Sequence, residues 1–73
     1  MHHNNTISLW YRIPKKNLYF VVNTLEAYEG LAIVRTDRKD NELNEIQTTY
    51  CQLEVLKDIM DDFQKKGIVI EVI

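Results

Sequence analysis

The chain has 73 residues, of which 45% are hydrophobic and 27% charged, so it is long enough for one folded domain and too apolar for a disordered segment. Its single cysteine excludes an internal disulfide and a cysteine-rich zinc cluster, and its net charge of −2 argues against a general phosphate-binding surface. The sequence has neither an apolar run of membrane-spanning length nor a signal-peptide pattern, so we expect a cytoplasmic protein without a membrane partner.

Residues 1–5 are polar, and we expect a disordered tail there, in which His2 and His3 are either native or the remnant of a tag. Apolar-bodied residues then alternate with other residues through ISLWYRI, which predicts a strand over residues 6–13. Trp10 points to the face opposite the alternating set. That set is Ile7, Leu9, Tyr11 and Ile13.

Pro14 interrupts the strand pattern, and its fixed φ suits the start of a helix. Apolar residues at helical spacing predict a helix over residues 15–29, and Gly30 follows where helices commonly end. A β-branched run then predicts a strand over residues 31–36. The apolar stripe of this helix is Leu18, Val21, Val22, Leu25 and Tyr28.

The second half of the chain repeats this order. Residues 37–43 are charged and predict a surface loop, and alternation over residues 44–50 predicts a strand with one wet face. A second apolar stripe predicts a helix over residues 52–66, which Gly67 ends, and residues 68–73 predict a final strand. The second stripe is Leu53, Leu56, Ile59, Met60 and Phe63.

The element order β-α-β-β-α-β predicts one ferredoxin-like α+β domain over residues 6–73. Right-handed crossovers place both helices on one face of a four-stranded antiparallel sheet, in a two-layer sandwich. The first and third strands are then central, and Trp10 lies in the middle of the face that the helices leave bare.

The bare face of this fold binds RNA in some proteins, where aromatic side chains of the first and third strands stack on bases. Here the third strand offers Glu45, Gln47 and Thr49 beside Trp10, with no aromatic residue among them. We therefore expect no nucleic-acid partner, and RNA binding is the disfavoured alternative.

Trp10 with Arg12 and Arg35 forms the candidate interface, unless the two arginine stems simply cover the indole. Phe20 lies opposite the apolar stripe of the first helix. It is either a second contact patch or an aromatic side chain that faces solvent.

The sequence shows little catalytic potential. Cys51 near a helix start lacks a histidine to pair with, and the carboxylates of the second helix form an ordinary solvated row. We expect no catalytic residue, metal site or cofactor. The carboxylates of this row are Asp58, Asp61 and Asp62.

Lys15 and Lys16 open the first helix, where free amides and the helix dipole favour an anion, so a small carboxylate or phosphate is a candidate ligand.

The stretch WYRIPKKNLYFVVNTLEAYEGLAIVRT, residues 10–36, resembles a family of short bacterial proteins that is classed as a domain of unknown function. Its most specific part is EAYEGLAIVRT, residues 26–36. This resemblance implies the same β-α-β-β-α-β length and no known reaction. More distantly, the layout is similar to ACT-type regulatory domains, which bind small effectors at a glycine-containing loop after the first strand. The corresponding loop here, residues 13–17, has no glycine.

We therefore expect a non-catalytic interaction module that forms a homodimer through the open sheet face or a sheet edge around Trp10. The first alternative is an ACT-like domain that binds a small effector near Lys15, Lys16 and Gly30. The second alternative is an enzyme that uses Cys51 or the acidic helix.

Overall fold

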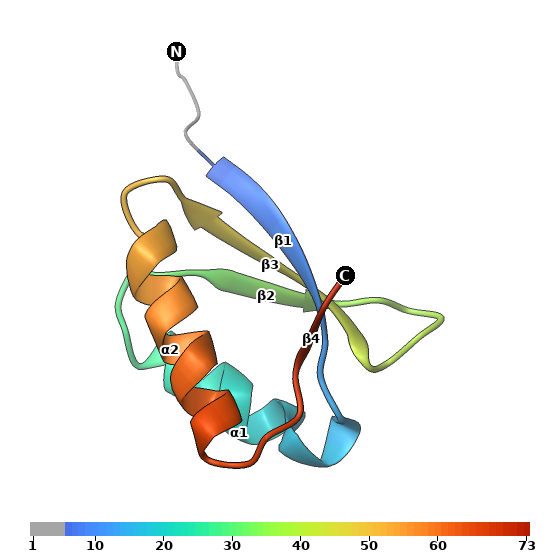
Figure 1. Ribbon diagram of the computed structural model, residues 1–73. Coiled ribbons are helices and arrows are strands. Elements are labelled where there is room, and N and C mark those ends of the chain that lie inside the picture. The colour runs from blue at the N-terminus through green and yellow to red at the C-terminus, as the bar shows by residue number, and fades with distance from the viewer. Residues whose placement is uncertain (1–5) are drawn as a thin grey trace.

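The computed structural model describes residues 6–73, so the expectations for residues 1–5, including those for His2 and His3, lie outside the described residues. The predicted order of elements is confirmed (Figure 1). The elements are β1 (Thr6–Arg12), α1 (Lys15–Glu26), β2 (Ile33–Thr36), β3 (Leu43–Thr49), α2 (Leu53–Lys65) and β4 (Glu71–Val72).

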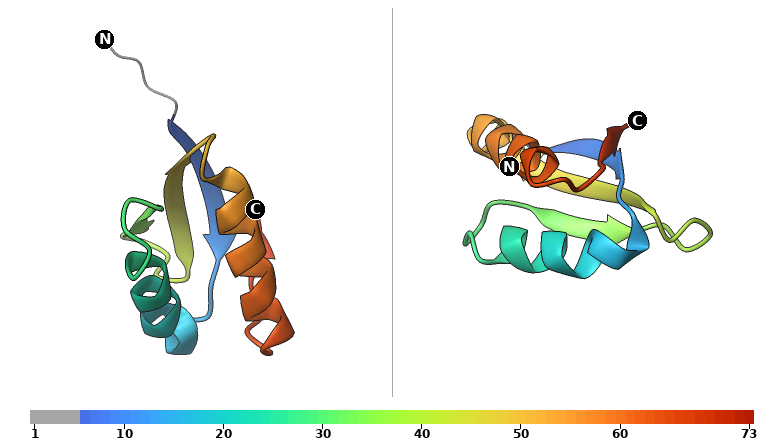
Figure 2. Two further views of the ribbon diagram at one scale, coloured as in Figure 1. Left: turned by 90° about the vertical axis from the view of Figure 1, so that its left-hand side faces the viewer. Right: turned by 60° about the horizontal axis from the view of Figure 1, so that its bottom comes forward.

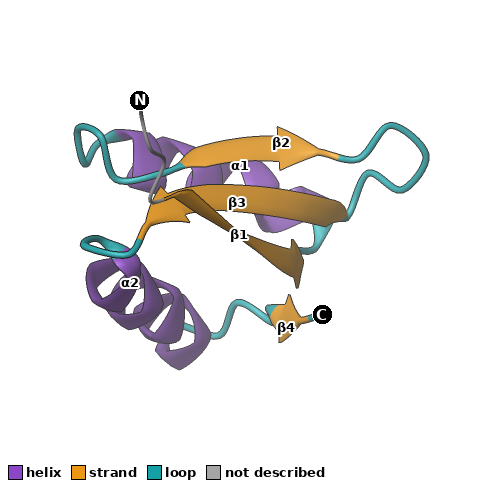
Figure 3. Cartoon of the chain, turned by 90° about the horizontal axis from the view of Figure 1, so that it is seen from above, coloured by secondary structure: helices purple, strands orange, loops and turns teal. Residues whose placement is uncertain are grey.

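The four strands form one sheet in the order β2-β3-β1-β4, with every neighbouring pair antiparallel. This arrangement is the predicted ferredoxin-like fold, with β1 and β3 in the centre. β1 pairs with β3 along its whole length, and the register sets Leu9 opposite Ile46 and Trp10 opposite Glu45. Figure 3 shows β2 and β4 at the two edges of the sheet, with α1 passing beneath β2 and β3.

One hydrophobic core lies between the sheet and the two helices. In Figure 2, α1 lies nearer to β2 and α2 lies nearer to β1. Alternate residues of β1 and β3 face the core, as the period-2 pattern predicts. The buried hydrophobic residues are Tyr11, Ile13, Val21, Leu25, Leu31, Ile46, Leu56, Met60, Phe63, Ile68 and Ile70.

The end of α1 differs from the prediction. The helix ends at Glu26 rather than at residue 29, and Tyr28, which was expected in the apolar stripe, is 48% exposed. Tyr28 N–H bonds to the Leu25 carbonyl at 3.2 Å, a tighter spacing than in an α-helix, and Gly30 then turns the chain at φ +72°. This tight turn moves Tyr28 off the core-facing side before the helical period would have brought it there.

The final strand is much shorter than predicted, because only Glu71–Val72 pair with β1. Two local hydrogen bonds hold the preceding residues close to the end of α2. Ile68 N–H donates to the Phe63 carbonyl at 3.1 Å, and Gln64 Nε2 donates to the Ile70 carbonyl at 3.2 Å. The remaining boundaries agree with the predicted ones to within two residues.

Asn44 is the largest fully buried polar side chain of the described residues. Its Oδ1 accepts a hydrogen bond from Thr36 Oγ1 at 2.7 Å, and its Nδ2 donates to the Glu42 carbonyl at 3.0 Å. The side chain therefore joins the end of β2 to the start of β3 from inside the core.

We expect Asn44→Ala to lower the free energy of unfolding by about 1–3 kcal/mol, since it removes two hydrogen bonds in a site closed to water. Urea denaturation followed by circular dichroism measures the change. Asn23→Ala is the matched control, because Asn23 is exposed on α1 and its loss is expected to change stability by less than about 0.5 kcal/mol. Equal midpoints for the two variants would contradict the role given to Asn44.

Candidate functional interface beside Trp10

The structure places Trp10 on the open face of the sheet, with 40% of its surface exposed. Glu45 lies opposite Trp10 on β3, and Arg35 lies opposite Glu45 on β2, so the three side chains form one row across the sheet. Ser8 Oγ donates to Glu45 Oε2 at 2.7 Å, which holds the carboxylate toward β1. The centre of the open face is therefore an indole beside a fixed carboxylate.

The C-terminal strand supplies the apolar neighbour of Trp10. Ile73 N–H donates to the Trp10 carbonyl at 2.9 Å, so Ile73 lies directly beside the tryptophan on the sheet. Ile73 is 66% exposed and Val72 is 72% exposed. Ile73 shares the open face with Trp10, whereas Val72 lies opposite Tyr11 and points to the helix side. The sequence does not fix this register, which decides the face of each residue.

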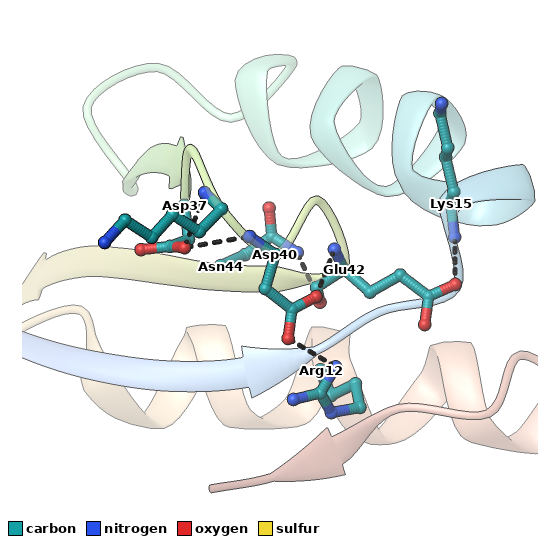
Figure 4. A network of polar contacts seen from close by, with 7 residues as sticks. Arg12, Lys15, Asp37, Asp40, Glu42 and Asn44 are labelled. Carbon is teal, nitrogen blue, oxygen red and sulfur yellow. Dashed lines mark hydrogen bonds and ion pairs between the residues drawn. The ribbon is translucent and has the colours of Figure 1, made fainter.

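Arg12 is held by the β2–β3 loop rather than lying free over the indole. Its Nη1 contacts Asp40 Oδ2 at 2.9 Å (Figure 4). Asp40 Oδ1 also accepts a hydrogen bond from Glu42 N–H at 3.1 Å. This backbone bond, followed by the bond from Arg12, lowers the pKa of Asp40 below its ordinary value of 3.8.

The same loop is closed by a second carboxylate. Asp37 Oδ2 accepts hydrogen bonds from the backbone N–H groups of Lys39 and Asp40, each at 2.9 Å, in the manner of an Asx turn (Figure 4). The charged residues that predicted a solvated loop thus give residues 37–42 a defined shape.

A third carboxylate of the network occupies the start of α1. Glu42 Oε2 accepts a hydrogen bond from Lys15 N–H at 3.2 Å, and the Glu42 carbonyl accepts one from Ile13 N–H at 2.8 Å. The helix N-terminus, which was predicted as an anion site, therefore already faces an anionic side chain of the chain itself.

The structure does not bring the predicted effector residues together. Lys15 and Lys16 begin α1, whereas Gly30 follows its other end. A helix of 12 residues is about 18 Å long, so these residues cannot share one small ligand. A hollow of about 210 Å³ does lie beside Gly30, but no charged side chain lines it. Its lining is Thr6, Gly30, Leu31, Ala32, Ile33, Gln47, Thr48 and Thr49.

The sequence placed Phe20 opposite the apolar stripe of α1, but its side chain also contacts a core residue of α2. Its ring meets that of Phe63 on α2 edge to face, with centroids 5.8 Å apart and an interplanar angle of 71°, and 49% of its surface stays exposed. Phe20 therefore joins the two helices, on the side of the molecule away from Trp10.

Cys51 is exposed at the turn before α2, without a histidine beside it in the described part of the chain. Among residues 6–73, no group of three His, Cys, Asp or Glu side chains is arranged to hold a metal ion. No helix within the same residues has the length and apolarity needed to cross a bilayer.

The fold and the exposed indole define a small ferredoxin-like α+β domain with one bare sheet face. Residues 11–66 match the family described as "Domain of unknown function (DUF4911)", and the chain belongs to this family, which confirms the predicted membership. The matched region contains both helices and the β2–β3 hairpin and begins directly after Trp10. No curated protein and no solved structure matches the chain.

The Asp40–Arg12 contact predicts acid-dependent stability. The pKa of Asp40 is lowered in the folded state, so its contribution is present above the ordinary pKa of 3.8 and is lost as the pH falls through the lower folded value. Asp40→Asn should therefore destabilise the protein at pH 7 and make less difference near pH 3, as measured by urea midpoints. For Asp58→Asn on the exposed side of α2, we expect little change at either pH. An Asp40→Asn effect that is the same at both pH values would rule out this role.

Proposed function

We propose that this chain is a non-catalytic interaction module that self-associates as a dimer through the sheet surface beside Trp10. The observation that carries the proposal is that β1 is paired with a neighbouring strand over more residues on one edge than on the other. This central strand pairs with β3 along seven residues but with β4 along only two. Part of one edge of β1 is thereby left without a strand in the described region.

The composition of this surface supports the proposal. Trp10 and Ile73 expose apolar area next to each other on the open face, and charged side chains surround them. An apolar centre with a polar rim is the usual anatomy of a protein–protein interface, and tryptophan is enriched among the residues that dominate binding energy. The surrounding charged residues are Arg12, Arg35, Glu45 and Glu71.

The size of the chain favours association with a second copy. A domain of 73 residues buries a modest fraction of its surface, and small domains usually gain stability from disulfides, metals or oligomerisation. With one cysteine, an internal disulfide is excluded. Self-association is the route that the composition leaves open.

The same surface gives little support to RNA binding. The position beside Trp10 on β3 is held by Glu45, whose carboxylate is fixed by Ser8. A carboxylate there repels phosphate and offers no ring on which a second base would stack.

Sedimentation of the wild-type chain over micromolar to submillimolar concentrations tests the proposal. We expect the average mass to rise from 8.7 kDa toward twice that value. Trp10→Ala should weaken the dimer about tenfold or more, since truncating a central tryptophan typically costs at least ~1.4 kcal/mol of binding.

Tyr19→Ala is the matched control, because it removes an exposed aromatic side chain from α1. We expect it to dimerise like the wild type. A wild-type chain that stays at 8.7 kDa at every concentration, or equal weakening by the two substitutions, would overturn the proposal.

A further inference from the structure

One row of side chains crosses the open face of the sheet in the order of the strands. Arg35 on β2 lies opposite Glu45 on β3, and Glu45 lies opposite Trp10 on β1. Ile73, which follows β4, completes the row beside Trp10. The row therefore runs from a base to an acid and then to two apolar side chains, and Figure 3 shows the strands that carry it side by side.

The two charges of this row do not neutralise each other within the chain. Glu45 Oε2 accepts a hydrogen bond from Ser8 Oγ at 2.7 Å, on the side away from β2. In the described part of the chain, Arg35 is exposed and forms no ion pair, unlike Arg12. The open face thus presents a guanidinium without an anionic partner, next to a carboxylate that is held in place.

A second copy of this face is complementary to it in charge. When two sheets stack face to face around a two-fold axis that runs along the strands, the second copy presents its row in the reverse order. With this axis between β2 and β3, Arg35 of each copy faces Glu45 of the other. An axis across the strands would instead set Arg35 against Arg35 and Glu45 against Glu45, which like-charge repulsion disfavours.

We propose that two copies stack their open faces so that Arg35 of each copy pairs with Glu45 of the other and lies beside its Trp10. This inference rests on the proposed self-association and specifies which side chains meet. Packed sheets lie about 10 Å apart, a gap that an arginine and a glutamate side chain can bridge, and neighbouring strands are about 4.8 Å apart. A guanidinium that meets Glu45 is therefore also within reach of the indole on the next strand, and arginine both pairs with carboxylates and stacks on aromatic rings.

Two charge-reversal variants test the pairing by sedimentation. Arg35→Glu and Glu45→Arg each set like charges against each other in a homodimer, so we expect each to self-associate at least about tenfold more weakly than the wild type. In an equimolar mixture, the two substituted side chains face each other with opposite charges, as do the unchanged Glu45 and Arg35. We expect the mixed dimer to form at least about tenfold more tightly than either variant alone.

Mixing also separates a contact between chains from one within a chain. Each variant carries two like charges side by side on its own sheet, so a pair that acts only within one chain would not be restored by the other variant. We expect both variants to show the circular dichroism of the wild type, because each substitution lies on the open face outside the core.

Lys57→Glu and Asp58→Arg are the matched controls, because they make the same changes of charge on the exposed side of α2. Each substitution changes the charge by two units, so in both sets one variant goes from −2 to −4 and the other from −2 to 0. General repulsion between chains is therefore equal in the two sets. We expect the controls, alone and mixed, to dimerise like the wild type.

The emission of Trp10 reports on the same contact, because the chain has one tryptophan. We expect acrylamide to quench this emission less as the wild type dimerises, since the second copy covers the indole. At the same concentrations, Arg35→Glu should stay as easily quenched as the dilute wild type. Quenching that is unchanged while the wild type dimerises would show that another surface carries the contact.

The outcomes separate the two proposals. If the wild type dimerises but mixing Arg35→Glu with Glu45→Arg restores no association, the pairing of Arg35 with Glu45 is overturned and self-association stands. If the wild type stays at 8.7 kDa at every concentration, both proposals are overturned.

Discussion

The ladder between β1 and β3 is the interaction on which the rest of the structure depends. Its register sends Tyr11 and Ile46 into the core and leaves Trp10 and Glu45 on the bare face. Because side chains alternate along a strand, a slip of one residue would exchange these two sets and bury the indole beside a carboxylate. Both the core and the candidate interface are therefore consequences of the same seven-residue pairing.

Three carboxylates in and beside the β2–β3 loop shape the backbone. Asp37, Asp40 and Glu42 accept hydrogen bonds from backbone amides, and two of them also tie the β2–β3 loop to Arg12 and to the start of α1. Carboxylates that accept several such bonds are held in place and are not free to meet a ligand. The bonds at the helix start therefore serve to close the fold.

The hydrogen bonds that shorten β4 also shape the surface beside Trp10. Gln64 and the Phe63 carbonyl hold the chain close to α2 until Ile70, so it reaches β1 late and pairs with it briefly. Ile68 and Ile70 are buried along this path, and the burial of their apolar side chains favours it. Ile73, beyond them, then remains exposed next to Trp10 on the open face.

The sequence by itself determined the order of the elements and the face of β1 on which Trp10 lies. Both follow from local periodicity, which is 2 in strands and 3.6 in helices, and from glycines that end helices at φ values other residues rarely adopt.

Only the tertiary structure decided the length of β4, the contact of Phe20 with Phe63, the pairing of Arg12 with Asp40 and the separation of Lys15 from Gly30. Each of these depends on which segments meet in space and on which of several competing partners a polar group takes. A periodic pattern carries no information about that choice, because it records the face of each residue and not what lies against that face.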